Sequence, residues 1–303
     1  ITESYVQEKE VGKKMKNRLK KKINGFSGKT HFALSLVIME LCLIISIYPP
    51  ITSKITSSLF LLIVCIISLS GGALLVDLDN DESTAKYSSG LLGLMMTLFM
   101  KSTSSIVWNV YHFKGDRKPP TQHRYLWHAP IIGISMILLF YFGIPTGDYN
   151  IFTNMRNSAD GMAGEFIKNN AILVLFILLI FLAILVGSNM IYRNLCKVVY
   201  LPKILKYILP VFSLIYVFTT TYTNLRIIGV CLGLGYLLHC LEDMFCDSSI
   251  PLIFPIPAVW KNKVWWKPHL PITVTTGSKV NSMIDIISGV LALILFFVVL
   301  AVR

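Results

Sequence analysis

The stretch 59–79, LFLLIVCIISLSGGALLVDLD, decides the fold class, because an unbroken apolar run ends in two aspartates. A helix needs about 20 mostly apolar residues to cross the hydrocarbon core of a bilayer, and the run 59–76 meets that need. Carboxylates are costly inside hydrocarbon, so Asp77 and Asp79 are expected just outside the membrane. The stretch therefore predicts a membrane-spanning helix with acidic side chains at its end.

The same apolar pattern recurs along the whole chain. Of its 303 residues, 54% are hydrophobic and only 15% are charged, and the mean hydropathy is +0.65. These values are too apolar for an ordinary soluble domain of this length. We predict an all-α, polytopic membrane helical bundle with about seven transmembrane helices, at 31–48, 59–76, 126–144, 170–191, 204–220, 224–241 and 284–302.

An eighth apolar run, 91–111, differs from these seven. Lys101 and the cluster 102–105, which is made of Ser and Thr, lie at its middle. A lysine at the centre of a bilayer is costly, so we expect this run to form an interfacial or re-entrant helix.

The distribution of basic residues predicts how the chain threads the membrane. The formal net charge is +12, and Lys and Arg concentrate in cytoplasmic loops of membrane proteins. With seven spans, all but five of the 28 Lys and Arg residues fall on the side of the N-terminus; the exceptions are Lys54, Arg156, Lys168, Arg226 and Arg303. We therefore expect a multi-pass protein of the cell (inner) membrane with a cytoplasmic N-terminus.

Two parts follow from this threading. Residues 1–30 form a basic cytoplasmic arm, too long for the charged region of a signal peptide, so the first span is expected to be retained. Residues 31–303 form a single membrane-embedded domain. Because the sequence opens with Ile1, we expect the natural start to lie upstream. Membrane lipids are the expected partners of the arm, and nucleic acid is not expected; protein partners are left open.

The His and Asp residues at the span ends are all expected on the same side of the membrane. All of them fall at the cytoplasmic mouths of the predicted spans, at a similar depth. They are His31, Asp77, Asp79, His123, His128, His239 and Asp243. Scattered polar residues would be divided between the two faces of a seven-span protein. Their agreement predicts one metal site, in which all seven are candidate ligands.

The local spacing adds detail to this site. His239 and Asp243 are four apart and share a helical face. Asp77 and Asp79 are two apart, which predicts an extended segment just past the helix end. His123 and His128 are five apart, with His128 at the helix mouth before Pro130, so the two could serve different ions.

The mixture of imidazoles and carboxylates favours zinc, as one to three ions, and leaves Mn²⁺ or Mg²⁺ possible. The six cysteines form no CxxC pair, so we expect neither a disulfide framework nor a zinc ribbon.

Each of these signals also has a simpler interpretation. A single histidine at a membrane mouth is usually only interfacial, and HxxxD or DxD alone is weak; His112 and His269 are interpreted in that way. Glu40, near the middle of the first span, is expected to pair with Lys101 or another polar neighbour, with proton binding or contact with the metal site as alternatives. Asn281 and Asp285 are expected to support the site or to cap the last helix.

Four blocks of the chain resemble the YdjM-like, LexA-regulated family of membrane-bound metal-dependent hydrolases. They are Thr30 and His31, then Asp77 and Asp79, then His123, Arg124 and His128, and last GYLLHCLED at 235–243 followed by IPLIFP at 250–255. The resemblance covers about 30–130 and 230–290, so 145–225 is a predicted insertion. Val76, Trp127 and Ala129 depart from the family pattern, which has Pro, Thr and Ser at these positions.

The resemblance implies a metal-dependent hydrolase. The family is distantly similar to zinc-dependent phospholipase C, which implies hydrolysis of a phosphoester, most plausibly of a phospholipid or another lipid-linked substrate at the cytoplasmic membrane surface. Asp77 and Asp79 would then hold metal or accept a proton, and Arg124 would contact phosphate or lie among the lipid headgroups. The alternatives are a transporter or an ion or proton pathway, and a non-catalytic membrane partner in a stress or defence system.

Overall fold

We describe the protein from a computed structural model, which describes residues 28–45, 49–80, 83, 85–86, 89–110, 125–145, 147, 171–196, 200–245, 250, 258–260, 263–265 and 278–302. Its α-helices are α2 (Gly28–Ile45), α3 (Pro49–Ser57), α4 (Leu59–Leu75), α6 (Gly90–Val110), α7 (Pro130–Gly143), α10 (Ala171–Leu195), α11 (Leu205–Thr219), α12 (Tyr222–Asp243) and α13 (Lys279–Val302). Two short 3-10 helices are η1 (Val76–Asp79) and η2 (Leu126–His128). The all-α helical bundle expected from the sequence is confirmed.

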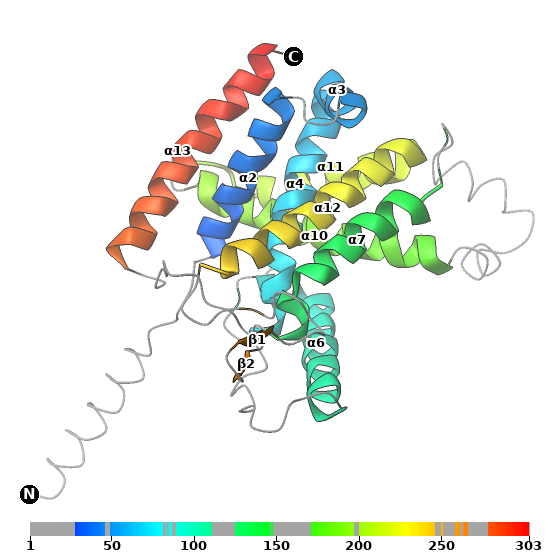
Figure 1. Cartoon of the computed structure of the whole chain (residues 1–303). Coiled ribbons are helices and arrows are strands. Elements are labelled where there is room, and N and C mark those ends of the chain that lie inside the picture. Colours follow the sequence, from blue (N-terminus) through cyan, green and yellow to red (C-terminus); the bar gives the residue numbers. More distant parts are fainter. Residues whose placement is uncertain are drawn as a thin grey trace, which may run out of the picture.

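Helix α4 lies at the centre of the bundle (Figure 1). It packs against α12, α10 and α2, while α7 packs on α12 and α13 packs on α2. The apolar side chains of α4 are buried almost throughout, and they join one continuous core with residues of α10 and α12. An apolar helix that is buried on nearly all sides belongs at the centre of such a bundle.

Glycines allow the helices around α4 to approach closely. A Cβ atom on Gly72 would collide with the carbonyl oxygen of Leu232 on α12, and one on Gly235 would collide with the carbonyl oxygen of Leu69 on α4. Gly187 of α10 is equally close to the carbonyl of Ile67. Small residues at such crossings permit the backbone contact that drives helix association in membranes. The residues from 171 to 196, part of the predicted insertion, thus supply a helix to the core.

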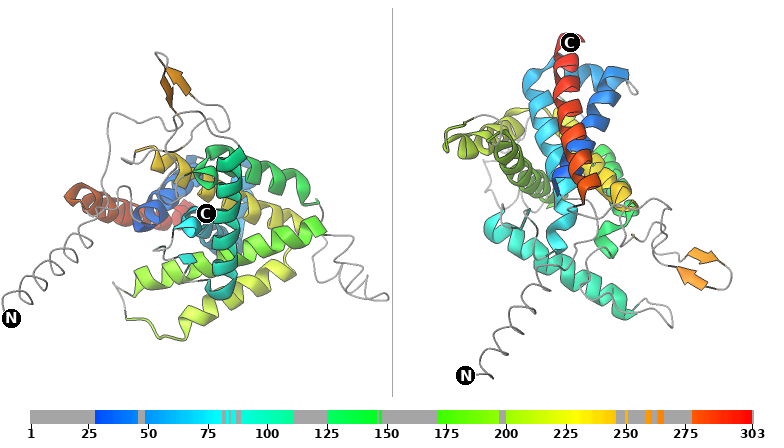
Figure 2. Two further views of the ribbon diagram at one scale, coloured as in Figure 1. Left: turned by 90° about the horizontal axis from the view of Figure 1, so that it is seen from below. Right: turned by 90° about the vertical axis from the view of Figure 1, so that its left-hand side faces the viewer.

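One end of the bundle gathers several chain segments, and we call it the site end. Helix α2 begins there, η1 follows the last turn of α4 there, η2 leads into α7 there, and α12 ends there (Figure 1). The chain leaves the bundle at Asp79 and returns at His128, and the side chains of these two residues lie 3.4 Å apart. Helix α6, which connects them, lies beyond the site end in the views of Figure 2, and its main contacts are with η1 and η2.

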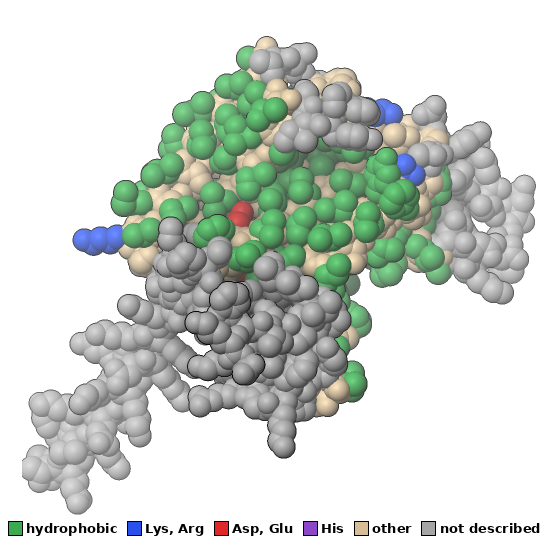
Figure 3. Space-filling view, in the orientation of Figure 1, with side chains coloured by type: hydrophobic (Ala, Val, Ile, Leu, Met, Phe, Trp, Pro, Cys, Tyr) green, Lys and Arg blue, Asp and Glu red, His purple; other side chains and the backbone are tan. Residues whose placement is uncertain are grey.

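The helix lengths agree with a membrane protein. In the described part of the chain, six helices are long and apolar enough to cross a bilayer: α2, α4 together with η1, α6, α10, α12 and α13. Five of the seven predicted spans are among them, whereas α7 and α11 have only 14 and 15 residues. The described part of the face shown in Figure 3 is mostly hydrophobic, with Lys and Arg near its edges. Apolar side chains such as Phe297 on α13 are exposed on the described surface, as lipid contact requires.

The structure adds one short element and corrects one boundary. The strands β1 (Ala258–Trp260) and β2 (Lys263–Trp265) form an antiparallel hairpin, in which Val259 pairs with Val264. The first helix already begins at Gly28, so 28–30 belong to α2 and not to the basic arm. The other residues of the arm lie outside the described part of the chain.

Candidate metal centre

The first turn of α2 contributes His31, which is buried at 1% exposure. The neighbouring Thr30 donates its hydroxyl to Asp285 and to Asn281 on α13. These contacts hold the start of α2 against the start of α13, and the role of Asn281 and Asp285 in supporting the site stays a prediction. The start of α2 is therefore fixed against α13 on one side, and the ring of His31 enters the bundle from the other side.

The aspartates of η1 point to different histidines. Asp77 Oδ1 lies 3.7 Å from His239 Nε2, and Asp79 Oδ1 lies 3.4 Å from His128 Nε2. The predicted extended segment is wrong, because Val76–Asp79 continues α4 as a 3-10 helix. With about three residues per turn, positions two apart in such a helix lie well around its circumference, which explains the two directions. Asp79 is buried, whereas the side chain of Asp77 is 19% exposed.

His128 enters from η2, at the mouth of α7 as predicted. Pro130 is the first residue of α7, a position where its missing N–H leaves no helical bond unmade. The Tyr236 hydroxyl donates to the carbonyl of Trp127 and so fixes η2 on α12. The indole N–H of Trp127 faces outward and donates to Met100 O (3.0 Å) and Thr103 Oγ1 (2.9 Å) on α6.

Two carboxylates surround the His128 ring, which precedes α7. Nδ1 lies 2.7 Å from Asp243 Oδ2, and Nε2 faces Asp79. Both nitrogens of this buried ring therefore face carboxylate oxygens.

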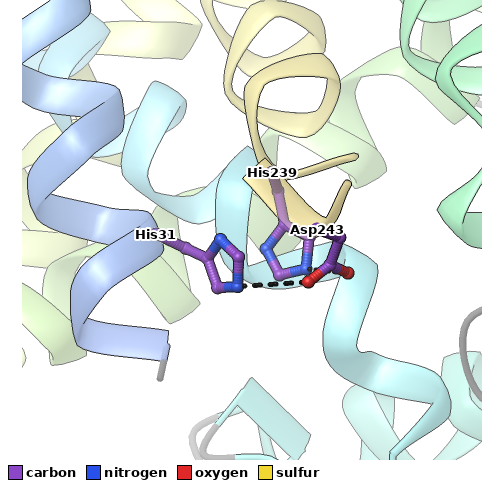
Figure 4. A group of neighbouring side chains, drawn as sticks. All are labelled: His31, His239 and Asp243. Carbon is purple, nitrogen blue, oxygen red and sulfur yellow. Dashed lines mark ion pairs between the residues drawn. The ribbon is translucent and has the colours of Figure 1, made fainter. Parts of the chain in front are cut away.

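The last turn of α12 contributes His239, Glu242 and Asp243. As the spacing predicted, His239 and Asp243 share a face, with Nε2 and Oδ2 3.3 Å apart. Asp243 also lies 3.5 Å from His31 Nε2 through its other oxygen, the ion pair drawn in Figure 4. The His31 and His239 rings stack with centroids 3.8 Å apart. Neither ring nitrogen of His239 has a hydrogen-bond partner among the described residues, although the ring is fully buried.

The contacts in this cluster fall into two classes of distance. The Nδ1 atoms of His31 and His128 lie 2.6 and 2.7 Å from Glu242 and Asp243, which are short hydrogen bonds. The Nε2 atoms of all three histidines lie 3.3–3.7 Å from aspartate oxygens. Two ligands of one tetrahedral zinc ion, each about 2.1 Å from the metal, are about 3.4 Å apart. The Nε2 contacts therefore have the spacing of atoms that share an ion.

Two groups of three ligand atoms fit a single ion each. One consists of His31, His239 and Asp243, and the other of Asp77, His128 and His239; within each group the atoms lie within 4.8 Å of one another. His239 belongs to both groups, and each of its two ring nitrogens can serve only one ion at a time. The donor set of imidazoles and carboxylates suits zinc or a similar transition metal.

The structure brings together six of the seven residues predicted as ligands, and their role as ligands stays a prediction. His123 and Arg124 lie outside the described residues. Glu242 was missed: it belongs to the cluster through His31, and the only signal for it was a second acidic residue at the end of an apolar helix. Glu40 forms no ion pair with Lys101; it is buried in α2 at 2% exposure, and its Oε2 has no hydrogen-bond partner among the described residues.

Comparisons with protein-family models, with curated proteins and with solved structures find no match to this chain.

Proposed function

We propose that this protein is a membrane-bound metal-dependent hydrolase whose ion is held at the site end of the bundle. The observation that carries the proposal is the spacing of the Nε2 atoms of His31, His128 and His239 from aspartate oxygens, at 3.3–3.7 Å. These contacts are too long for strong hydrogen bonds and match the separation of two ligands on one ion.

The burial of the cluster supports a bound cation. Four carboxylates, those of Asp77, Asp79, Glu242 and Asp243, meet three imidazoles, and all except Asp77 are at most 8% exposed in their side chains. Burying a charge or an imidazole without a partner is costly, and proteins offset that cost by pairing or by metal coordination. A cation near His239 would also bind a ring nitrogen that has no hydrogen-bond partner among the described residues.

Several residues would hold the ion and act on a substrate. His31, His239 and Asp243 form one candidate ligand set, and Asp77 joins His128 and His239 in the other. When bound, a divalent ion would supply a Lewis acid that acidifies water and neutralises charge on a phosphoryl group. Asp77 is the most exposed carboxylate of the cluster. We therefore propose that the substrate approaches from the side of Asp77 and that the Asp77 carboxylate accepts a proton.

A lipid-linked phosphoester is the substrate that we favour. The cluster lies at the end of apolar helices, where headgroups would be within reach if those helices cross the bilayer. The resemblance to the YdjM-like hydrolases points in the same direction and extends to Arg124 as a phosphate contact. With the orientation that we expect from the basic residues, the reaction would take place at the cytoplasmic surface of the cell membrane.

The experiment is a hydrolysis screen with purified protein loaded with Zn²⁺, Mn²⁺ or Mg²⁺ on a panel of phospholipids and other lipid-linked phosphoesters. We expect release of product by the wild type with at least one metal, and a loss of at least about 100-fold in His239→Ala and Asp77→Ala. His269→Ala, outside the predicted ligands, is the matched control. Activity that survives His239→Ala would overturn the proposal.

One observation favours a second candidate, an ion or proton pathway. Glu40 is buried within α2, and its Oε2 has no hydrogen-bond partner among the described residues, as in a group that binds and releases a proton. Transport sites usually lie near the membrane midplane, whereas the cluster lies at one end of the helices. Metal or proton flux into proteoliposomes that is lost in Glu40→Gln would favour this candidate over the hydrolase.

A further inference from the structure

Glu242 is the one acidic residue of the cluster whose carboxylate lies at hydrogen-bond distance from His31. Its Oε2 is 2.6 Å from His31 Nδ1, and the two residues are 211 positions apart in the chain. Both side chains are buried, at 1% for His31 and 8% for Glu242. A short charge-assisted contact between buried groups is strong, because water does not compete for either partner.

The ionisation state of Glu242 sets which nitrogen of His31 bears hydrogen in this contact. An ionised carboxylate only accepts hydrogen bonds, so Nδ1 donates to an ionised Glu242. In the neutral ring, Nε2 then has the lone pair, and Nε2 is the atom that lies 3.5 Å from Asp243 Oδ1. Such a carboxylate–histidine pair orients the ring and raises the basicity of the nitrogen that faces a metal.

The surroundings of the His31 ring restrict its rotation further. The ring stacks on His239 at a centroid distance of 3.8 Å and an interplanar angle of 25°. A ring held on one face by a neighbouring ring and at one edge by Glu242 has a single direction left for Nε2. That direction leads to Asp243, a member of the same ligand group, whose Oδ1 lies 3.5 Å from Nε2.

We propose that Glu242 is a positioning residue that holds His31 in the Nδ1–H tautomer and directs Nε2 at the ion. The inference rests on the proposed function, because it deepens the same site. Glu242 would act only through His31. A direct ligand would act independently of His31, and this difference makes the two roles separable by experiment.

The first test is a double-mutant cycle on zinc affinity, measured by competition with a chromophoric chelator. We expect Glu242→Leu to weaken binding by about 10–100-fold, the usual effect of losing such a partner. Glu242→Gln should lose less, because its amide oxygen still accepts from Nδ1–H. In the His31→Ala background, Glu242→Leu should change affinity by less than about 2-fold. An undiminished effect in that background would overturn the proposal and make Glu242 a ligand.

Glu40 offers a matched control, since it is also a buried glutamate but lies within α2 and outside the cluster. Glu40→Leu and Glu40→Gln should leave the zinc affinity unchanged. If they weaken zinc binding as much as the Glu242 variants, the effect reflects general damage to the bundle and the proposal fails.

The second test needs neither zinc nor activity. Nitrogen-15 NMR of histidine-labelled, metal-free protein should show His31 with hydrogen on Nδ1 in the wild type and in Glu242→Gln, and a shift toward the Nε2–H tautomer in Glu242→Leu. An unchanged tautomer in Glu242→Leu would overturn the positioning role. Protein that shows the tautomer shift but binds no metal would retain the role of Glu242 and overturn the proposed hydrolase.

Discussion

Asp243 is the residue on which the three histidines converge. Its Oδ2 accepts from His128 Nδ1 at 2.7 Å and lies 3.3 Å from His239 Nε2, while its Oδ1 lies 3.5 Å from His31 Nε2. Asp77, in contrast, makes its shortest contact with a described histidine at 3.7 Å, to His239, and is partly exposed. The two aspartates should therefore differ in what their loss does to the protein.

Asp243→Ala should destabilise the metal-free protein, because it leaves the buried Nδ1–H of His128 without its acceptor. The expected loss is about 1–3 kcal/mol, seen as a lower melting temperature in detergent. Asp77→Ala should reduce hydrolysis while the melting temperature stays within about 2 °C of the wild type. Equal melting temperatures for the two variants would contradict the different roles assigned to these carboxylates.

At this scale the sequence predicted most of the cluster. His31, His128 and His239 lie at the ends of apolar helices. Polar side chains at such positions indicate a structural or functional role, so these histidines could be identified from the sequence. Glu242 could not, because its role depends on a contact between α2 and α12 that no local spacing encodes. The direction of Asp77 and Asp79 was missed for a similar reason, since a 3-10 turn after an α-helix has no clear sequence signal here.

The helices owe their arrangement to close crossings at glycine. Gly72 and Gly235 face backbone carbonyl oxygens of the opposite helix across the α4–α12 contact, and this contact aligns η1 with the end of α12. Gly289 of α13 is also helical but has no atom within 4 Å of the position of a Cβ. The chain thus contains a packed and an open glycine for comparison.

Gly235→Ala should push α12 away from α4 and lower both the melting temperature and the bound zinc, since His239 and Asp243 lie on the displaced helix. Gly289→Ala should be neutral or stabilise by up to about 1 kcal/mol, because alanine is the better helix former and meets no atom. Thermal unfolding and metal content of the two purified variants check this. Equal effects would contradict the role of the α4–α12 crossing.

The helices themselves were predicted well from hydropathy, because long apolar runs have few alternatives. The α4–α12 crossing was not predicted. A glycine in an apolar run can indicate close helix packing, but it can also lie at a position where any small residue is tolerated. The hairpin of β1 and β2 was also missed. Its three-residue strands are too short for an alternating pattern to stand out.

For the whole molecule, the path of the chain limits how α6 can relate to the membrane. Asp79 and His128 meet at the site end, so the segment between them begins and ends on one side. A single crossing by α6 would place the two ends of this segment on opposite sides of the membrane, although the helix is long enough to span it. The path favours the interfacial or re-entrant position predicted from Lys101.

Cysteine labelling tests this position. Leu91 and Val110 lie near the two ends of α6 and are 75% and 82% exposed. In a background without the native cysteines, Leu91→Cys and Val110→Cys should both react with a membrane-impermeant reagent from the cytoplasmic side. Reaction from opposite sides would mean that α6 crosses the bilayer.

The central claim is that the clustered histidines and aspartates bind a metal. The most direct measurement is metal content together with zinc X-ray absorption on the purified, full-length protein. We predict at least one zinc ion per chain, with nitrogen and oxygen ligands at about 2.0–2.2 Å and no sulfur at about 2.3 Å, and loss of this ion in His239→Ala but not in His269→Ala. Wild-type protein without metal, or with zinc that His239→Ala retains in full, would contradict the account.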